Sequence, residues 1–112
     1  MNNLNRSDFE KVEMRVGTVI DVVDFPEARK PSFKLTIDFG EKIGIKKTSA
    51  QVTVLYKKKD LLNKQVVAVI NFPKKQIANF MSECLVIGVY NVEGKVVLLQ
   101  ASKAIKNGEQ VH

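Results

Sequence analysis

Apolar and polar residues alternate along several short stretches of this chain, which is the pattern of β-strands with one buried face. The clearest alternation covers 33–39, where the expected inward side chains are Phe33, Leu35, Ile37 and Phe39. A longer stretch, 14–25, predicts another strand, which would place on one face Val16, Thr18, Ile20 and Val22. Gly17 inside that stretch predicts a bend or bulge, as small barrels need where a strand curls.

Further strands are expected where Val, Ile and Leu accumulate, at 43–49, 66–70, 85–90 and 95–100. The stretch 50–56 can be read in two ways. Its Val and Thr residues favour a strand, but a short helix that caps one end of a barrel fits the same residues equally well. The run Lys57-Lys58-Lys59 is either a solvated loop or a non-specific contact to phosphates.

Two turns and one helix complete the expected elements. Asn91 to Gly94 predicts a hairpin turn, and Asn107-Gly108 predicts a last small hairpin, with apolar partners at Ile105 and Val111. Near the N-terminus, Ser7 and Glu10 have the spacing of a capping box, which predicts a short helix over 7–12. So short a helix is not stable alone, and we expect it to dock on its own barrel or on a second subunit.

Many short strands at even spacing, with one or two very short helices, predict an all-β fold. Five main strands in a chain of 112 residues suit an oligonucleotide-binding (OB) fold, a five-stranded β-barrel, here with a short N-terminal helix and a small C-terminal extension. We expect a single domain over 1–112, large enough to bury a core without disulfides or metal.

The charge balance points to anionic partners. The formal net charge is +6 and the isoelectric point is near 9.5, which favours nucleic acid first and an acidic membrane surface or acidic polypeptide second. The single cysteine, Cys84, begins an apolar stretch and is expected to be a buried thiol. No stretch is long enough to span a bilayer and the start has no apolar leader, so we infer a cytoplasmic protein without membrane insertion.

The side chains of most catalytic and metal sites are missing from the pattern. The only histidine is the last residue, His112, so neither metal-ligand spacing nor a Cys–His or Ser–His pair is available. A phosphate-binding Walker loop and a G-x-G-x-x-G motif are absent too. We therefore expect neither a cofactor nor an enzymatic active site.

The connector 71–84 between two apolar stretches joins basic residues to large apolar side chains. It contains Lys74 and Lys75 together with Phe72, Phe80 and Met81. Charge beside aromatic surface, held between two strands, is a plausible binding edge. A solvated loop that anchors itself by its own apolar residues explains the pattern equally well.

Several segments, in order and at fitting spacing, resemble the structure-specific tRNA-binding domain, an OB-fold module that occurs free or appended to methionyl- and phenylalanyl-tRNA synthetases. The resemblance covers nearly the whole chain. The segments that carry it are Glu13-Met14-Arg15-Val16-Gly17-Thr18-Val19, Phe25-Pro26-Glu27-Ala28-Arg29, Lys34-Leu35-Thr36-Ile37-Asp38-Phe39-Gly40, Asn71-Phe72-Pro73 and Ser82-Glu83-Cys84-Leu85-Val86-Ile87-Gly88.

Within that family the chain looks most like the free-standing CsaA group, which are homodimers described as export-related molecular chaperones. The agreement is close in Ile43-Gly44-Ile45-Lys46, Ser49-Ala50-Gln51, Val69-Ile70-Asn71-Phe72-Pro73 and Val97-Leu98-Leu99-Gln100. Synthetase-appended members usually carry Ser-Gln-Gly-Met where this chain has Ser82-Glu83-Cys84-Leu85, so Glu83 adds negative charge beside the expected RNA edge.

The resemblance implies two functions, tRNA binding and the holding of unfolded or presecretory polypeptides, and the alternative is a tRNA-binding or RNA-chaperone module without a role in export. A purely structural domain would do neither. The expected RNA contacts are Lys46, Lys47, Ser49, Asn71, Lys74, Lys75 and Ser82. The expected lining of an apolar peptide groove is Phe33, Phe80, Met81 and Tyr90.

Overall fold

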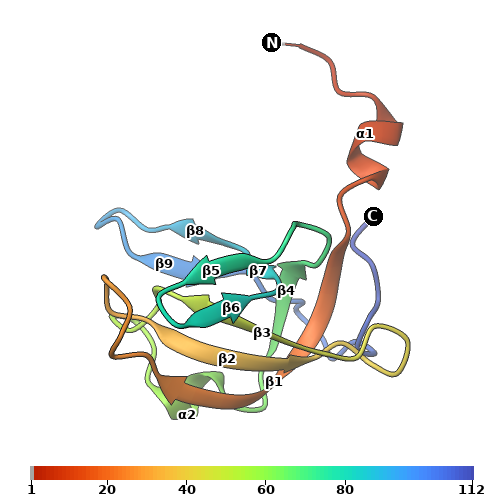
Figure 1. Ribbon diagram of the computed structural model, residues 1–112. Coiled ribbons are helices and arrows are strands. Elements are labelled where there is room, and N and C mark those ends of the chain that lie inside the picture. Colours follow the sequence, from red (N-terminus) through yellow and green to blue (C-terminus); the bar gives the residue numbers. More distant parts are fainter. Residues whose placement is uncertain (1) are drawn as a thin grey trace.

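The computed structural model describes residues 2–112 and shows a nearly closed, five-stranded antiparallel barrel, which confirms the all-β OB-type fold (Figure 1). The strand order in the main sheet is β3-β2-β1-β4-β7, and two small hairpins, β5–β6 and β8–β9, are attached to it. The elements are α1 Arg6–Glu10, β1 Met14–Asp24, β2 Phe33–Asp38, β3 Ile45–Ala50, α2 Lys58–Leu61, β4 Gln65–Val69, β5 Lys75–Ile77, β6 Phe80–Ser82, β7 Leu85–Val86, β8 Gly88–Tyr90 and β9 Val96–Leu98.

The long strand β1 is shared between the two halves of the barrel. Its first residues, from Met14 to Thr18, pair with β4, and from Thr18 to Asp24 it pairs with β2. A bulge at Ile20 interrupts the ladder to β2, so Val19 and Val22 are both buried while Ile20 is exposed. The predicted common face of β1 is therefore wrong beyond this bulge.

Gly17 is needed for close packing rather than for the bulge. A Cβ atom at Gly17 would lie 2.6 Å from Cγ2 of Ile37 and 2.7 Å from Cδ1 of Phe39, which is closer than side-chain atoms tolerate. The bare backbone of β1 thus lets two large side chains of the β2 segment cross the barrel interior beneath it.

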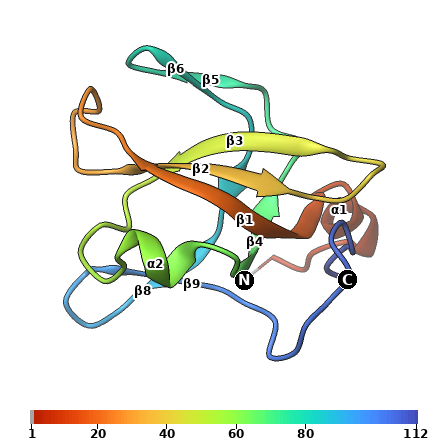
Figure 2. The same cartoon turned by 90° about the horizontal axis from the view of Figure 1, so that it is seen from below.

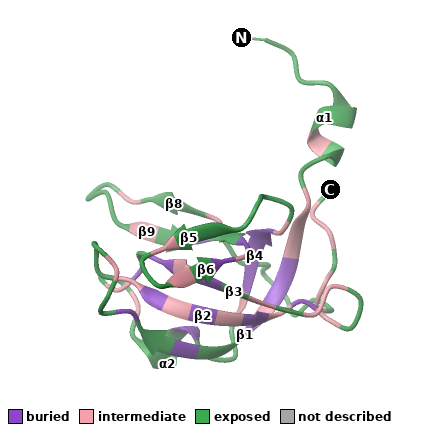
Figure 3. Ribbon diagram, in the orientation of Figure 1, coloured by how far each residue is buried: buried purple, intermediate pink, exposed green. Residues whose placement is uncertain are grey.

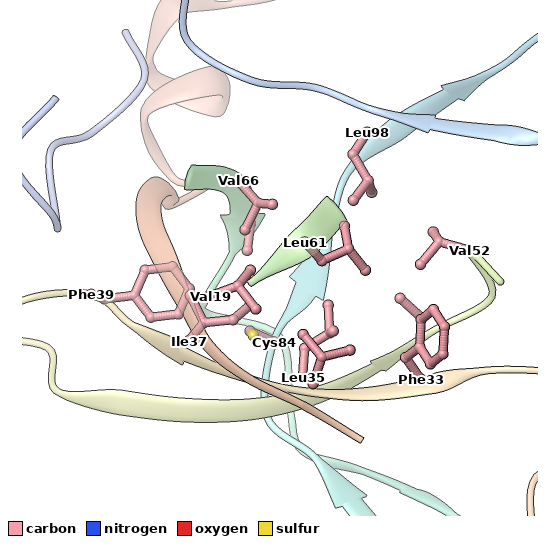
Figure 4. Close-up of a cluster of buried hydrophobic side chains, with 13 residues drawn as sticks. Val19, Phe33, Leu35, Ile37, Phe39, Val52, Leu61, Val66, Cys84 and Leu98 are labelled. Atoms are coloured by element: carbon pink, nitrogen blue, oxygen red, sulfur yellow. The ribbon is translucent and has the colours of Figure 1, made fainter. Parts of the chain in front are cut away.

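The core is built from the inward face of β2 and the strands around it. The alternation predicted for 33–39 is confirmed, since Phe33, Leu35, Ile37 and Phe39 are buried (Figure 3). Figure 4 shows these side chains converging with others from β1, the loop before α2, α2 and β4, among them Val19, Val52, Leu61 and Val66. Each such side chain contributes roughly 1.5–3 kcal/mol on burial.

The barrel closes between β3 and the link from β6 to β7. The backbone N–H of Glu83 donates to the carbonyl of Lys47 at 2.8 Å. The backbone N–H of Lys47 donates in turn to the side-chain carboxylate of Glu83 at 2.9 Å. The Thr48 hydroxyl donates to the Cys84 carbonyl at 2.6 Å and lies 3.0 Å from the Ser82 hydroxyl. We call these residues the barrel seam: Lys47, Thr48, Ser82, Glu83 and Cys84.

The N-terminal helix differs from its prediction. Helix α1 begins after Asn5, and the Ser7–Glu10 capping box does not form, since no side chain caps the helix. Glu10 instead pairs with Arg6, with Nε and Oε1 3.4 Å apart. None of the helix residues is buried, and α1 projects from the end of the barrel (Figure 3).

The ambiguous stretch 50–56 is neither a strand nor a helix beyond the end of β3 at Ala50. It forms a turn in which Tyr56 N–H donates to the carbonyl of Val52. The second helix, α2, falls in the lysine run instead, where the carboxylate of Asp60 accepts the backbone N–H of Lys57 at 2.8 Å. Its Leu61 is fully buried, which fixes the helix to the barrel.

Two further predictions need correction in the second half of the chain. The connector 71–84 is a β-hairpin, β5–β6, whose turn carries Ala78 at a positive φ of 52°. The stretch 85–90 is divided into β7 and β8 rather than forming one strand. The turn predicted at Asn91 to Gly94 is confirmed, since it joins β8 to β9 with Gly94 at φ 76°.

The C-terminal segment turns at Asn107-Gly108 as predicted, but it does not form its own hairpin. It lies along β1, where Gly108 N–H donates to the Val16 carbonyl and Val111 N–H donates to the Met14 carbonyl. This pairing covers the edge of β1 that β2 leaves free. In the part of the chain that the structure describes, no helix is long and apolar enough to cross a membrane.

Candidate nucleic-acid interface

Cationic side chains gather around the outward face of β2 and β3. Because β2 turns Phe33, Leu35 and Ile37 inward, it turns Lys34 outward, directly opposite Ser49 of β3. Lys47, two residues earlier on β3, lies on the same outward face. The β1–β2 loop and the β5–β6 hairpin lie beside this face in both views (Figures 1 and 2). We call the cations of these elements the basic face: Arg29, Lys30, Lys34, Lys47, Lys74 and Lys75.

Two aromatic rings hold one of these cations in place. The ammonium of Lys34 lies 4.8 Å from the ring centroid of Phe25 and 5.3 Å from that of Phe80. The two rings meet edge to face, with centroids 5.4 Å apart. Such contacts contribute about 0.5–1.5 kcal/mol each. They join the β5–β6 hairpin to the end of β1 and fix the position of a positive charge between them.

The paired lysines Lys46 and Lys47 are separated by the strand that carries them. Neighbouring residues of a strand point to opposite faces. Thr48 is buried, so Lys46 shares the inward side of β3 and is half-buried, whereas Lys47 is exposed. Of these two predicted phosphate contacts, only Lys47 belongs to the basic face.

The side chain of Asn71 has its own partners within the chain. Its amide oxygen accepts the backbone N–H of Glu13 at 3.1 Å, and its amide nitrogen donates to the carbonyl of Lys11 at 2.7 Å. Asn71 therefore ties the segment between α1 and β1 to the end of β4. Both ends of its amide are thereby used within the chain, which makes Asn71 an anchor of the fold and not part of the basic face.

The two predicted serines lie in different environments. Ser82 is buried, and its hydroxyl lies in the barrel seam beside Thr48, 3.2 Å from the carbonyl of Cys84. It faces the interior and not the expected RNA edge. Ser49 is half-buried on the outward side of β3, next to Lys34, and remains within the basic face region.

The residues expected to line a peptide groove are not brought together. Phe33 is 7% exposed and belongs to the core, and Phe80 is half-buried against Phe25. Met81 and Tyr90 are exposed, at 44% and 77%. They lie on β6 and β8, whose hairpins occupy opposite sides of the barrel (Figure 2). A single groove made of these four side chains is therefore not formed.

An apolar surface does exist, but on other residues. Val89 of β8 and Val97 of β9 are direct partners in the ladder, so their side chains share one face. Leu99, two residues after Val97, continues it. Their exposed fractions are 53%, 37% and 41% for Val89, Val97 and Leu99. We call these three residues the apolar strip. Residues 96–99 are all apolar, so the sequence contains no alternation that would have distinguished the exposed face from the buried one.

Sequence reasoning also missed half of the basic face. Arg29 and Lys30 were not among the expected RNA contacts, although a loop beside the β2–β3 face is a usual binding loop of OB folds. Lys34 lies between the inward residues Phe33 and Leu35 and was not among the expected RNA contacts either. The alternation around it was the signal that could have found it.

The only thiol of the chain, that of Cys84, is buried and unreactive. Burial raises the pKa of the Cys84 thiol to about 11, against the lowering influence of Lys46. A thiol with so high a pKa is a poor nucleophile at neutral pH. Among residues 2–112, no group of three or more His, Cys, Asp and Glu side chains is placed to hold a metal ion.

Comparison with known proteins places these features in a family. Residues 14–110 match the family described as "Putative tRNA binding domain". The chain is 31% identical over 111 residues to the methionine–tRNA ligase of Methanocaldococcus jannaschii, covering 99% of this chain and 17% of that protein. It therefore spans only a small part of the length of the curated relatives it matches.

Two solved structures match over their whole length. The CsaA chaperone protein of Picrophilus torridus is 47% identical, with a TM-score of 0.91 over 98% of this chain and 100% of that one. The chaperone CsaA of Bacillus anthracis is 44% identical, with a TM-score of 0.91 over 99% of this chain and 100% of that one. The resemblance to the CsaA group found in the sequence is thereby confirmed.

Proposed function

Since this chain belongs to the tRNA binding domain family, we propose that it binds tRNA through the basic face. The observation that carries the proposal is the placement of cations on two loops and two strands at one side of the barrel. The outward surface of the second and third strands, with the flanking loops, is where OB folds bind oligonucleotides. Here these elements are β2, β3, the β1–β2 loop and the connector that contains β5 and β6.

The chemistry of the basic face suits a folded RNA. Lysine and arginine side chains contact phosphates without reading sequence, and they make binding dependent on salt. Phe72 and Met81, which are 56% and 44% exposed, lie on the same connector and supply apolar surface for an unstacked base. A tRNA offers both a dense phosphate backbone and unstacked loop bases.

A titration of labelled total tRNA at several salt concentrations tests this proposal. With five or six cations in contact, the plot of log K against log salt is expected to have a slope of about −4 to −5, and affinity to fall steeply between about 50 and 200 mM salt. The absence of a salt-sensitive complex even at about 50 mM salt would refute tRNA binding.

We infer that the protein acts as a binding module and not as an enzyme, and that it works in the cytoplasm, where tRNA is used. The buried, neutral Cys84 thiol supports a non-catalytic role. A screen of tRNA before and after incubation for cleavage, deacylation and modification tests this part, and any turnover would contradict it.

A homodimer is the assembly that we propose. Helix α1 has five residues and buries none of them, although a helix of this length is not stable on its own. Docking on a second copy would supply the packing that the barrel of its own chain does not. Sedimentation at micromolar concentration is expected to show the dimer, and deletion of residues 2–10 to shift it to monomer.

Binding of unfolded or presecretory polypeptides is the second function that we propose, in keeping with an export-related chaperone. The exposed apolar strip of Val89, Val97 and Leu99 supports it, because extended chains can cover such a surface with their own apolar side chains. The test is whether the protein slows the aggregation of a denatured client at near-stoichiometric ratio. Adding tRNA then shows whether the two ligands compete; separate surfaces predict that they do not.

A further inference from the structure

Glu83 forms contacts on both sides of the barrel seam. One carboxylate oxygen, Oε1, accepts the backbone N–H of Lys47 at 2.9 Å. The other, Oε2, lies 3.6 Å from the ammonium of Lys74 on the chain before β5. The side chain of Glu83 is 27% exposed and that of Lys74 is 64% exposed, so water reaches the pair from the Lys74 side. One side chain therefore serves the fold and a basic-face cation at once.

Only one of these two contacts requires a negative charge. The N–H of Lys47 needs an acceptor, and an amide oxygen of the same shape would satisfy it. The backbone N–H of Glu83 closes the seam independently by donating to the Lys47 carbonyl. The charge of Glu83 acts instead on Lys74, whose ammonium it holds near the seam and whose positive charge it partly offsets. A phosphate that approaches Lys74 has to displace a carboxylate that is already there.

We propose that Glu83 lowers the affinity of the basic face for the phosphate backbone of nucleic acid by occupying Lys74. The inference rests on the proposed tRNA binding. Lys75, the next residue, has no ion pair within residues 2–112 and stays available for phosphate. Two neighbouring lysines thus contribute unequally, and the difference between them is set by one carboxylate.

Substitution E83Q is the direct test, because glutamine keeps the acceptor for Lys47 and removes the charge. The variant is expected to bind total tRNA about fivefold more tightly at about 0.1 M salt, and its salt dependence to steepen by about one unit of slope as Lys74 becomes free. Its midpoint of thermal unfolding should match the parent protein, since the seam contacts remain.

The matched control is E93Q in the turn between β8 and β9, which changes the net charge equally. Glu93 is exposed and has no ion pair in the described part of the chain. In a protein that already carries K74Q, the gain from E83Q should disappear. Equal gains from E83Q and E93Q, or a gain that survives K74Q, would overturn the proposal.

A second pair of variants keeps the proposal testable if E83Q does not fold. K74Q and K75Q remove the same charge from adjacent residues, and K75Q is expected to weaken tRNA binding about threefold more than K74Q. Equal losses of tRNA affinity in K74Q and K75Q would overturn the proposal that Glu83 occupies Lys74. If the parent protein does not bind tRNA at all, the proposed function fails first, and that result is distinct from an unchanged E83Q affinity.

Discussion

The basic face and the apolar strip differ in how their exposed side chains are held. On the basic face, Lys34 is fixed by two rings and Lys74 by a carboxylate, while the charged ends stay in water. On the apolar strip, Val89 and Val97 pack against each other and leave much of their surface bare. Exposed cations are stable in water and act at a distance, whereas exposed valines gain free energy only on contact, at roughly 25 cal/mol per Å².

The comparison teaches that the two surfaces select partners by different physical means. Salt should weaken whatever the basic face binds and hardly affect what the apolar strip binds. Their positions on opposite sides of the barrel also allow each to be altered without touching the other (Figure 2).

The largest effect is expected from removing three basic-face cations together, K34Q, K47Q and K75Q. Affinity for tRNA should fall about a hundredfold at about 0.1 M salt, and the salt slope should become shallower by about two to three units. The matched control K59Q, K95Q and K103Q removes the same charge from α2, the β8–β9 turn and the C-terminal segment. Equal losses in both variants would show that net charge, and not this face, binds the RNA.

Substitutions V89T and V97T together should break the apolar strip while leaving charge unchanged. Burying two hydroxyl groups against an apolar ligand costs about 1–3 kcal/mol each without a hydrogen-bond partner, so the affinity for a denatured client should fall at least about thirtyfold. The control is V92T, in the exposed turn. The tRNA affinity of the variant with both V89T and V97T is expected to equal that of the parent protein. A weaker tRNA affinity would show that the apolar strip contributes to RNA binding as well.

The burial of Cys84 in the barrel seam can be tested by the pH dependence of stability. Burial raises the pKa of Cys84 to about 11, from a reference value of 9.0 in the unfolded chain. The folded state therefore retains the proton longer, and the stability that this thiol contributes is present below about pH 9 and is lost as pH rises through about 11. Between about pH 8 and 10, the parent protein should lose about 1 kcal/mol more than C84A in urea unfolding. Parallel losses would contradict a buried thiol.

The smallest effect is expected at Phe80. Substitution F80L removes the ring that meets Phe25 and lies under Lys34, so tRNA affinity should weaken about two- to threefold. The salt slope should not change, because the number of phosphate contacts stays the same. The control is Y90L, which removes an exposed ring on β8, outside the basic face. A shallower slope in F80L would mean that Lys34 itself is lost.

The sequence predicted those elements whose evidence is local. The alternation of Phe33 to Phe39 determined which face of β2 is buried, and the glycine of the β8–β9 turn marked its hairpin. The β5–β6 hairpin was missed because its residues have little strand character, and because Phe80 holds it on Phe25, distant in the sequence. The predicted C-terminal hairpin was wrong because this segment pairs with β1, which is also distant in the sequence.

The candidate site was predictable to a similar extent. The charges of Lys47, Lys74 and Lys75 are visible in the sequence, and so is the outward direction of Lys34. The roles of Asn71 and Ser82 could not be read from the sequence, because their hydrogen-bond partners belong to remote segments. These partners are Lys11, Glu13 and Thr48. A polar residue beside a basic stretch has the same sequence signal whether it meets a ligand or its own chain.

The two hydrogen bonds of Asn71 have a mechanical consequence. The amide holds the chain just after α1, and the next residues lead directly into the connector that bears Lys74 and Lys75. Displacing the helix is therefore expected to disturb the start of that connector. If the protein dimerises through α1 and binds tRNA as proposed, the two equilibria should be thermodynamically linked: displacement of α1 would change the affinity for RNA, and bound RNA would oppose that displacement by the same free energy.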